Sequence, residues 1–383
     1  MYCNMDKVSK NGTDMVESVV DSIKNIREKY IVIVLTIMIV GTLISLAYFY
    51  YGVYNLETTT CKINNNMYPS INPHILSINN SENFKYMFRD YYIKTAANCC
   101  STGDIKGGIV STCALRNVIK DGVRGLDFEI YSVDNRPVIA TSTLDKYTVK
   151  ETYNSVHFED ALGVIINYAF SRGSCPNPED PIIIHLRFMS NNQTMYSNLA
   201  TILQQNENML LPDKYNYESR NTNFGETPLL RLGKKIIIVV CNKNKTYMDV
   251  RPLYKYVNMT SGSIFMRYHT NEQVRNVPNL EEFIQYNKRN MSIVTPDRVS
   301  DTSNPGSIAS RKMGVQMTAM QYNNNDTSLQ EMRDFFNKQN TAFALKPEEL
   351  RFVQKYINAP EKQDPKLSFA TKTAVAQGLQ FKM

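Results

Sequence analysis

An uninterrupted apolar run near the start of the chain constrains its fold more than any other feature. Residues 31 to 50 read IVIVLTIMIVGTLISLAYFY, without a charged side chain. Because a helix rises about 1.5 Å per residue, such a run spans roughly the 30 Å hydrocarbon core of a bilayer. Tyr51 and Tyr54 follow it, where a signal peptide would have a small-residue cleavage site. The sequence therefore predicts a transmembrane helix, which we place at residues 31–54.

The charges that flank this run predict its orientation. Basic residues precede it at positions 7, 10, 24, 27 and 29, whereas Lys62 stands almost alone after it. Cytoplasmic flanks carry the excess of Lys and Arg in single-pass proteins. We therefore expect residues 1–30 to form a cytosolic tail and the rest of the chain to lie on the lumenal or external side of a cellular or viral membrane.

Composition excludes one class of partner and hints at the source. The 43 basic and 36 acidic residues give a net charge of +7 and are spread along the chain. They form no basic blocks interleaved with aromatic residues, so a nucleic-acid partner is not expected. The chain is rich in Asn, Lys, Ile and Tyr and has no Trp. This bias suggests an AT-rich genome, such as those of protists or large DNA viruses.

The cysteines predict neither a zinc site nor a defined disulfide framework. Cys3 lies in the N-terminal tail, and the six others are Cys61, Cys99, Cys100, Cys113, Cys175 and Cys241. No C-x-x-C pair occurs, so structural zinc has no support. The irregular spacing makes disulfides the less favoured interpretation and names no pairing. Adjacent Cys99 and Cys100 are expected to be small buried hydrophobic residues.

Beyond the apolar run, short β-rich segments alternate with helical ones, which predicts a parallel sheet wrapped by helices. The expected strands lie near 91–95, 123–130, 137–141, 181–187, 235–241, 263–268, 291–295 and 314–321. Eight strands suggest a distorted (β/α)8 barrel of the TIM type, an α/β fold. The continuous apolar segments PIIIHLRF and KKIIIVVC fit strands that are buried on both faces.

The same pattern divides the chain into parts. A connecting segment is expected at 55–85, and the barrel at 86–351, in two halves at 86–245 and 263–351. After Arg351, Pro360, Pro365 and a weak apolar pattern predict one short helix and then a mobile tail over 352–383.

Several strings resemble the X and Y boxes of eukaryotic phosphoinositide-specific phospholipase C. YIKTAANCCSTGD is similar to Y-F-I-N-S-S-H-N-T-Y-L-T-G-D, and GVRGLDFEIY followed by RPVIATST is similar to G-C-R-x-x-E-L-D-x-W followed by P-V-V-Y-H-G-x-T. FEDALGVIINYAF and PIIIHLRFMSNNQTMYSNLATIL resemble the next two X-box strings. NKRNMSIVTPDRVSDTSN, GVQMTAMQY and FALKPEELR resemble the Y box.

The resemblance implies a barrel phosphodiesterase whose site lies at the C-terminal ends of the strands. The flanking modules of the cellular enzymes have no counterpart, and the transmembrane helix would take over their targeting role. In the family, one His stabilises the reacting phosphorus, a second acts as general acid, and calcium activates the inositol hydroxyl. By the quoted strings, the first His position is Ala97 and the second is Thr141. General acid catalysis alone contributes about 10²- to 10⁴-fold, so losing both groups leaves little rate.

The calcium site implied by the resemblance is eroded as well. Asn98 matches the family's Asn, and Asp127 and Glu129 match its E-x-D pair in swapped order, but Arg187 replaces a metal-ligating Glu. Alternate residues of a strand share one face, so Arg187 is expected to pair with Asp127 and Glu129 and to exclude the metal. We expect no cofactor, and at most a doubtful remnant metal site at Asn98, Asp127 and Glu129.

The phosphate-binding positions have changed too. Val239 and Cys241 replace a lysine pair, although Lys243 or Lys245 would substitute in a shifted register, and Ile293 and Thr295 replace an Arg and a Tyr. The remaining His candidate is His185, two residues before Arg187, for which a satisfied core histidine is the favoured interpretation. His74, His157 and His269 are expected on exposed loops. The pocket would thus be formed by Asn98, Asp127, Glu129, Arg187 and Lys243.

These observations favour a membrane-anchored pseudoenzyme with a binding or structural role, whose partner is a phosphoinositide or a protein. One alternative is an active, calcium-independent phosphoric diester hydrolase with a rearranged site that uses His185. Another is an assembly protein with extended apolar surface outside the barrel.

Overall fold

The computed structural model describes residues 5–144, 149–216, 222–299, 303–354, 361–364 and 367–382, and side chains from residue 15 onward. Its central feature is a ring of eight parallel strands. In ring order these are β7 (Met259–Ser261), β6 (Ile236–Cys241), β5 (Ile182–Phe188), β2 (Gly125–Val133), β1 (Tyr91–Ala97), β10 (Met317–Gln321), β9 (Met291–Thr295) and β8 (Met266–Thr270). Each neighbouring pair is parallel, and within the described residues no ladder joins β7 to β8. The barrel is therefore nearly closed, as the sequence predicted.

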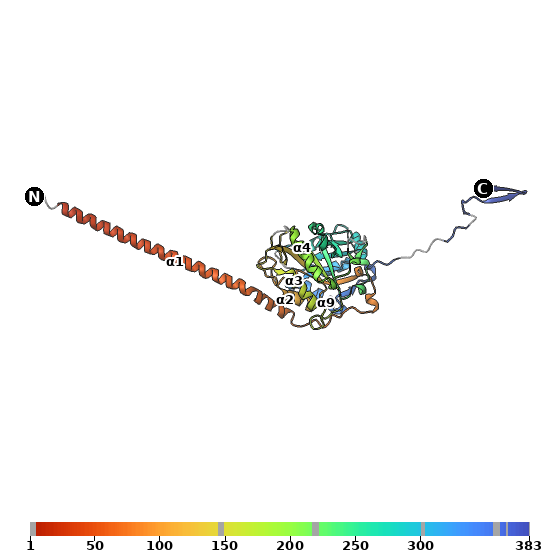
Figure 1. The fold of residues 1–383 in the computed structure, drawn as a ribbon, viewed down its shortest axis with the longest axis horizontal. Helices are drawn as coiled ribbons and strands as arrows, with labels where there is room; N and C mark the ends of the chain where they lie inside the picture. Colours follow the sequence, from red (N-terminus) through yellow and green to blue (C-terminus); the bar gives the residue numbers. More distant parts are fainter. Residues whose placement is uncertain are drawn as a thin grey trace. The chain divides into compact units, whose positions relative to one another are not determined.

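The barrel strands are apolar on both faces because one face lines the interior and the other lies under helices. All seven residues of β5 and all six of β6 are buried. The covering helices are α2 (Thr112–Lys120), α3 (Phe158–Ala169), α4 (Gln193–Gln205), α5 (Arg251–Tyr254), α6 (Asn271–Arg275), α7 (Leu280–Arg289), α8 (Ser307–Lys312) and α9 (Thr327–Gln339). Side chains cap the N-termini of several of these helices. The Asn192 side chain accepts a hydrogen bond from the Thr194 amide at the start of α4, and the Asp326 side chain accepts one from the Leu329 amide at the start of α9 (Figure 1 labels both helices).

Two expected strands differ from the observed ones. The segment expected at 137–141 forms β3 (Arg136–Ile139), which pairs antiparallel with β2 and with β4 (Val156–His157) and is not a ring strand. The strand expected at 263–268 begins only at Met266, as β8. The preceding strand β7 was not expected, and a turn at Gly262, whose φ of +84° suits glycine, separates the two. Strand propensity does not report the direction of pairing, so the predicted number was right although one member was wrong.

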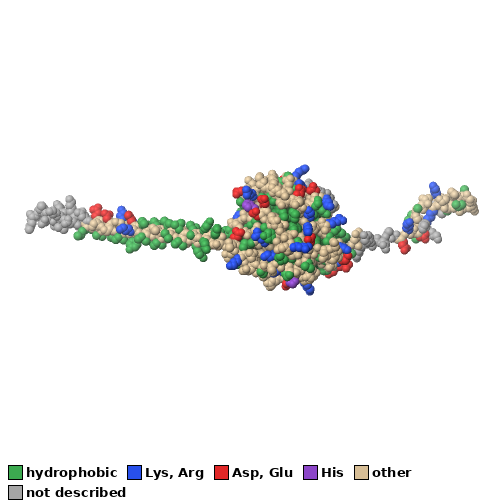
Figure 2. Space-filling model, turned by 60° about the horizontal axis from the view of Figure 1, so that its bottom comes forward, with side chains coloured by type: hydrophobic (Ala, Val, Ile, Leu, Met, Phe, Trp, Pro, Cys, Tyr) green, Lys and Arg blue, Asp and Glu red, His purple; other side chains and the backbone are tan. Residues whose placement is uncertain are grey.

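The N-terminal apolar run lies in α1 (Met5–Met67), a single long helix. Among the described residues it is the one helix that is long and apolar enough to cross a membrane. Figure 2 shows hydrophobic side chains covering this helix, and residues 15–52 are all exposed. By length and composition, α1 fits a membrane span.

A disulfide joins Cys61 near the end of α1 to Cys113 in α2. The sequence had left disulfides as the less favoured interpretation, because no spacing signal pairs two cysteines that lie 52 residues apart. Cys99 and Cys100 are buried free thiols, as expected. Burial raises the pKa of the Cys100 thiol well above its ordinary value, so this thiol is protonated and inert.

Two further segments complete the chain. β11 (Phe343–Leu345) pairs antiparallel with the start of β1, at the opposite end of the strands from the candidate site. Residues Phe352–Met383 form a separate unit, in which β12 (Thr373–Ala376) and β13 (Leu379–Lys382) make a hairpin. The short helix expected after Arg351 is not found at residues 361–364 or 368–382, and residues 355–360 and 365–366 lie outside the described part.

Candidate functional site

The register between β2 and β5 builds a charged cluster at the C-terminal ends of the strands, which we call the mouth. Asp127 is paired with His185, and Glu129 with Arg187, so two carboxylates face two basic side chains. Alternate residues of each strand point the same way, and all four side chains therefore meet inside the barrel. Asn98, which directly follows β1 and has a φ of +44°, completes the cluster from the next strand.

Arg187 makes the central contacts of this cluster. Its Nε and Nη2 donate to the two oxygens of Asp127 at 2.8 and 2.6 Å, and its Nη1 donates to Glu129 Oε1 at 2.7 Å. Nη2 also donates to Asn98 Oδ1 at 2.8 Å. Bidentate guanidinium–carboxylate pairs are among the strongest side-chain contacts. The ion pairs that the sequence predicted for Arg187 are confirmed.

The remaining oxygens of the cluster have partners as well. Glu129 Oε1 also accepts from Arg298 Nη2 at 2.8 Å, and Glu129 Oε2 accepts from the Tyr131 hydroxyl at 2.8 Å. Burial would raise the pKa of Asp127, but Arg187 and His185 hold that pKa well below its usual range. The cluster is therefore a charged network in which every oxygen of both carboxylates accepts a hydrogen bond.

A calcium ion does not fit this arrangement. Calcium needs six to eight oxygen ligands around an open position, whereas Asn98 Oδ1, both oxygens of Asp127 and Glu129 Oε1 receive hydrogen bonds from one guanidinium. Among the described residues, no group of three His, Cys, Asp or Glu side chains has the geometry of a metal site. A permanent cation occupies the place where these ligands converge.

The two positions that the resemblance assigns to the family's histidines hold side chains without acid–base chemistry. Ala97 ends β1 and is buried. Thr141 follows β3, is buried, and donates its hydroxyl to the Ile105 carbonyl at 2.9 Å. Neither side chain can carry a positive charge or exchange a proton near neutral pH.

His185 lies in the barrel interior with both ring nitrogens engaged. Nδ1 is 2.7 Å from Asp127 Oδ1, and Nε2 is 2.8 Å from the Ser261 hydroxyl at the end of β7. The three side chains have the hydrogen-bond order of a Ser-His-Asp triad. All three are fully buried, however, and Asp127 is also paired with Arg187. His185 is thus a satisfied core histidine, as expected.

A cavity of about 260 Å³ opens at the mouth beside this cluster. Its cationic lining residues are Arg187, Lys243 and Arg298, and Tyr268 and Cys241 lie among its other walls. The Lys243 ammonium lies 5.0 Å from the centre of the Tyr268 ring, a cation–π contact. The three cations of the lining outnumber Asp127 and Glu129, the two carboxylates of the cluster, by one.

The sequence missed Arg298, which lines the cavity, pairs with Glu129, and donates to the Leu144 carbonyl at 2.6 Å. Arg298 lies in the string TPDRVSD, two residues after the proline. In the family string that this segment resembles, the arginine comes two residues later, so the comparison of the two strings did not match them. A signal was present, because Arg298 is the first cation after the buried strand β9.

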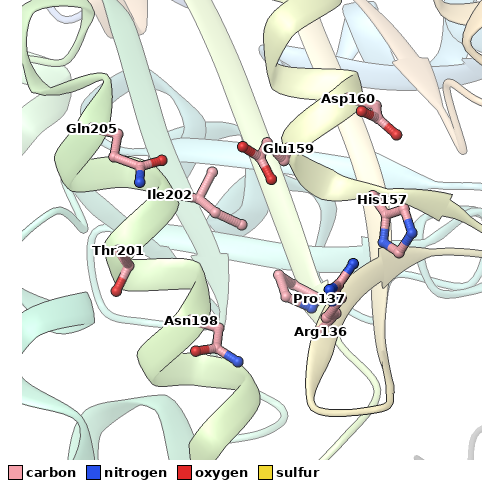
Figure 3. A pocket seen from close by; sticks show the side chains of 9 residues that line it. All are labelled: Arg136, Pro137, His157, Glu159, Asp160, Asn198, Thr201, Ile202 and Gln205. Atoms are coloured by element: carbon pink, nitrogen blue, oxygen red, sulfur yellow. The ribbon is translucent and has the colours of Figure 1, made fainter.

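The other histidines and a second cavity lie away from this site. A groove of about 510 Å³ runs between β3, the start of α3 and α4, and His157 is on its wall (Figure 3). His74 and His157 are exposed, as expected, although His157 lies in strand β4 and not on a loop. His269 is half-buried in β8 against the Phe283 ring. The groove contains Arg136, Glu159 and Asp160, and none of these belongs to the cluster at the mouth.

Comparisons with known proteins show what the barrel is similar to. Residues 84–242 match the family model of the phosphatidylinositol-specific phospholipase C X domain. The fold is similar to PLC21 of L. pealei, with 20% identity and a TM-score of 0.58 over 70% of this chain and 38% of that one. PLC21 of S. officinalis gives 20% identity and a TM-score of 0.58 over 72% and 39%.

At 20% identity, the likeness to these solved structures is confined to the fold. The chain spans 38–39% of the length of the two PLC21 proteins. A calcium-dependent phosphoinositol-specific phospholipase C from a Pseudomonas species is more distant, with 9% identity and a TM-score of 0.43, over 66% of this chain and 94% of that one. No curated protein sequence matches the chain.

Proposed function

Since the chain is a phosphatidylinositol-specific phospholipase C-like protein, we propose that it is a catalytically inactive relative that acts as a membrane-tethered binding protein. The helix α1 would anchor it as a single-pass protein, with residues 1–30 on the cytoplasmic side and the barrel on the lumenal or external side. The basic residues before the apolar run support this orientation.

The observation that carries the proposal is the position of Arg187. Its guanidinium contacts every oxygen-bearing side chain that would ligate calcium, through four hydrogen bonds of 2.6–2.8 Å. Burial would lower the pKa of Arg187, but Asp127 and Glu129 raise it well above its ordinary value, so the charge is permanent. A site filled in this way lacks the metal that would activate the inositol hydroxyl, and Ala97 and Thr141 supply no substitute acid or base.

The cavity supports binding of an anionic headgroup in place of hydrolysis. Arg187, Lys243 and Arg298 line it and bring net positive charge to a volume of about 260 Å³. That volume suits a small polar group. The ligand class we propose is a phosphorylated polyol headgroup, as in a phosphoinositide, and a protein partner remains the second binding hypothesis.

The rival hypothesis of an active, calcium-independent hydrolase has less support. It requires His185 to reach a substrate, but His185 is fully buried and both of its nitrogens are engaged. General acid or base catalysis requires a side chain within hydrogen-bond reach of the substrate.

The first experiment measures hydrolysis of phosphatidylinositol and its bisphosphate by the detergent-solubilised full chain, with and without calcium. The comparison protein carries Ala97→His, Thr141→His and Arg187→Glu together. We expect no turnover by the natural chain under either condition. Turnover without calcium would refute the inactive assignment, and a His185→Gln variant would then test whether His185 is used.

The second experiment measures binding of soluble inositol phosphates by calorimetry. Lys243→Gln should weaken binding by roughly tenfold, because one charge-assisted contact is worth about 1.5 kcal/mol. Lys245→Gln is the matched control, since Lys245 lies on the same loop and does not line the cavity. Equal affinities of the two variants would argue against the cavity as the binding site.

A further inference from the structure

The last turns of α1 pack against the barrel along one face. Residues 15–52 are exposed, and burial then begins at helical spacing with Val53, Leu56, Thr60, Asn64 and Tyr68. This i, i+3/i+4 pattern is that of a helix docked on one side. The apolar run 31–50 therefore ends only three residues before the docked face begins.

The docked turns contact the loop that leads from the candidate site. The Asn64 amide donates to the Thr102 carbonyl at 2.8 Å, and the hydroxyls of Thr60 and Thr102 lie 3.0 Å apart. Thr102 belongs to the loop that begins at Asn98, the Arg187 partner after β1. One short loop thus joins α1 to the cluster at the mouth.

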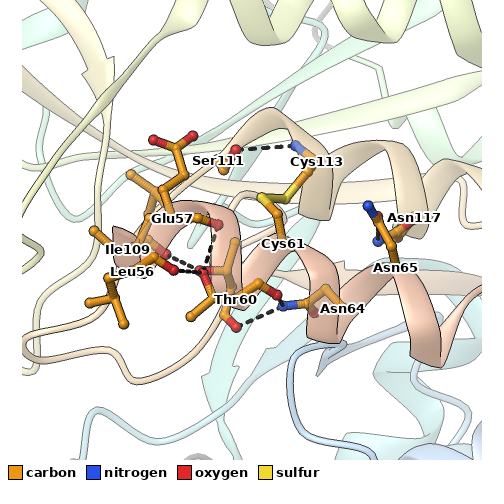
Figure 4. The surroundings of a disulfide bond; sticks show 12 residues. Leu56, Glu57, Thr60, Cys61, Asn64, Asn65, Ile109, Ser111, Cys113 and Asn117 are labelled. Carbon is orange, nitrogen blue, oxygen red and sulfur yellow. Dashed lines mark hydrogen bonds between the residues drawn. A yellow bond between two sulfur atoms is a disulfide. The ribbon is translucent and has the colours of Figure 1, made fainter. Parts of the chain in front are cut away.

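The direction of α1 is fixed by its pairing with α2. Cys61 is bonded to Cys113, Asn65 accepts from Asn117 at 2.8 Å, and the Tyr68 carbonyl accepts from Lys120 at 3.2 Å (Figure 4 shows the first two pairs). Residue numbers increase together in both helices, so the two helices run parallel.

The fold then sets which end of the barrel the apolar run leaves. Because α2 follows the C-terminal end of β1 and leads back to the start of β2, it runs away from the mouth. Followed from Cys61 toward its N-terminus, α1 must therefore pass the mouth and continue beyond it. The apolar run lies on the same side of the barrel as Arg187, Lys243 and the cavity.

We infer that α1 and the Cys61–Cys113 disulfide hold the barrel with its mouth against the headgroup layer of the membrane that α1 crosses. At about 1.5 Å per residue, the three-residue step from Tyr50 to Val53 places the docked face within about 5 Å of the end of the apolar run. The site would take an anionic headgroup from the adjacent leaflet of the same membrane. The inference rests on the proposed membrane anchoring and adds a fixed orientation to it.

The absence of Trp from the chain allows a direct test, because each introduced Trp is the only one present. Leu144, at the mouth, is 44% exposed and its carbonyl accepts from Arg298. Leu76 is 58% exposed, and its amide donates to the carbonyl of Asn340 after α9, at the opposite end of the barrel. Leu144→Trp and Leu76→Trp are therefore matched probes of the two ends.

The full chain carrying either substitution is reconstituted into phosphatidylcholine vesicles that contain a lipid with a nitroxide on its headgroup. We expect the nitroxide to quench Leu144→Trp several-fold more than Leu76→Trp. Adding Cys61→Ser and Cys113→Ser should reduce this contrast, because the docked turns are then held by non-covalent contacts alone.

Alkaline extraction of the same vesicles tests membrane anchoring separately from the orientation of the barrel. If the chain is extracted, membrane anchoring fails. If the chain is retained and the two probes are quenched equally, anchoring stands and the fixed orientation is wrong. If the difference in quenching between the two probes is unchanged in the Ser variant, the disulfide has no role in the orientation. The disulfide in the parent protein is checked by electrophoretic mobility with and without reductant.

Discussion

At the scale of single residues, Arg187 decides the character of the mouth. A glutamate there would add a third carboxylate beside Asp127 and Glu129 and create a cation site. The arginine instead pairs with both carboxylates, and its fork matches their geometry. An arginine in place of a glutamate thus turns a set of potential metal ligands into a network of ion pairs. The network depends on the guanidinium of Arg187.

Arg187→Met should therefore lower the free energy of unfolding by about 3–5 kcal/mol, because it removes the cation that both buried carboxylates share. Arg298→Met is the control, since Arg298 is 17% exposed and is one of three partners of Glu129. Denaturant titration in detergent measures both variants. Equal, small losses in the two proteins would contradict a central role for Arg187.

At the scale of elements, the barrel depends on close contacts between neighbouring strands. Gly125 begins β2 beside Thr95 of β1, and a Cβ atom on it would lie 2.5 Å from Thr95 Oγ1 and 3.0 Å from Met317 Cε. Gly163, in the middle of α3, has open space where its Cβ would be. The same substitution should thus have opposite effects at the two positions.

We expect Gly125→Ala to destabilise the barrel by roughly 1–3 kcal/mol through overpacking. Gly163→Ala should raise stability by about 0.5–1 kcal/mol, because alanine has the higher helix propensity. Thermal unfolding of the two variants beside the parent protein measures the difference. A loss of stability in both would show that α3 lacks the space found at Gly163.

At the scale of the whole molecule, buried charges make stability depend on pH. Lys346 follows β11, is buried, and donates to the Asn287 carbonyl at 2.9 Å. Burial lowers the pKa of Lys346 to about 7, against the opposing effect of Asp90. The folded protein therefore loses this proton near neutral pH, whereas the unfolded chain keeps it to its ordinary pKa of 10.5.

In this window the unfolded state binds more protons, so the contribution of Lys346 to stability rises with pH between about 7 and 10. Lys346→Met should flatten that rise and raise stability below pH 7 by on the order of 2–4 kcal/mol, relative to the parent. Unfolding at pH 6 and pH 9 measures the difference, with the exposed Lys312→Met as control. A pH slope that is the same in Lys346→Met and the parent would refute the lowered pKa.

The sequence alone determined those features that are written in local pattern. An uncharged apolar run, strands that are apolar throughout, and quoted strings from Tyr92 to Arg351 were enough for the barrel, the resemblance and the pairing of Arg187, because periodicity and residue type are local properties. Tertiary structure decided what depends on distant residues. The antiparallel direction of β3, the Cys61–Cys113 bond, the contact of Arg298 with Glu129, and the parallel packing of α1 on α2 all depend on pairings that the chain reveals only once folded. No spacing rule reports such contacts, since they form only when the closing barrel brings the segments together.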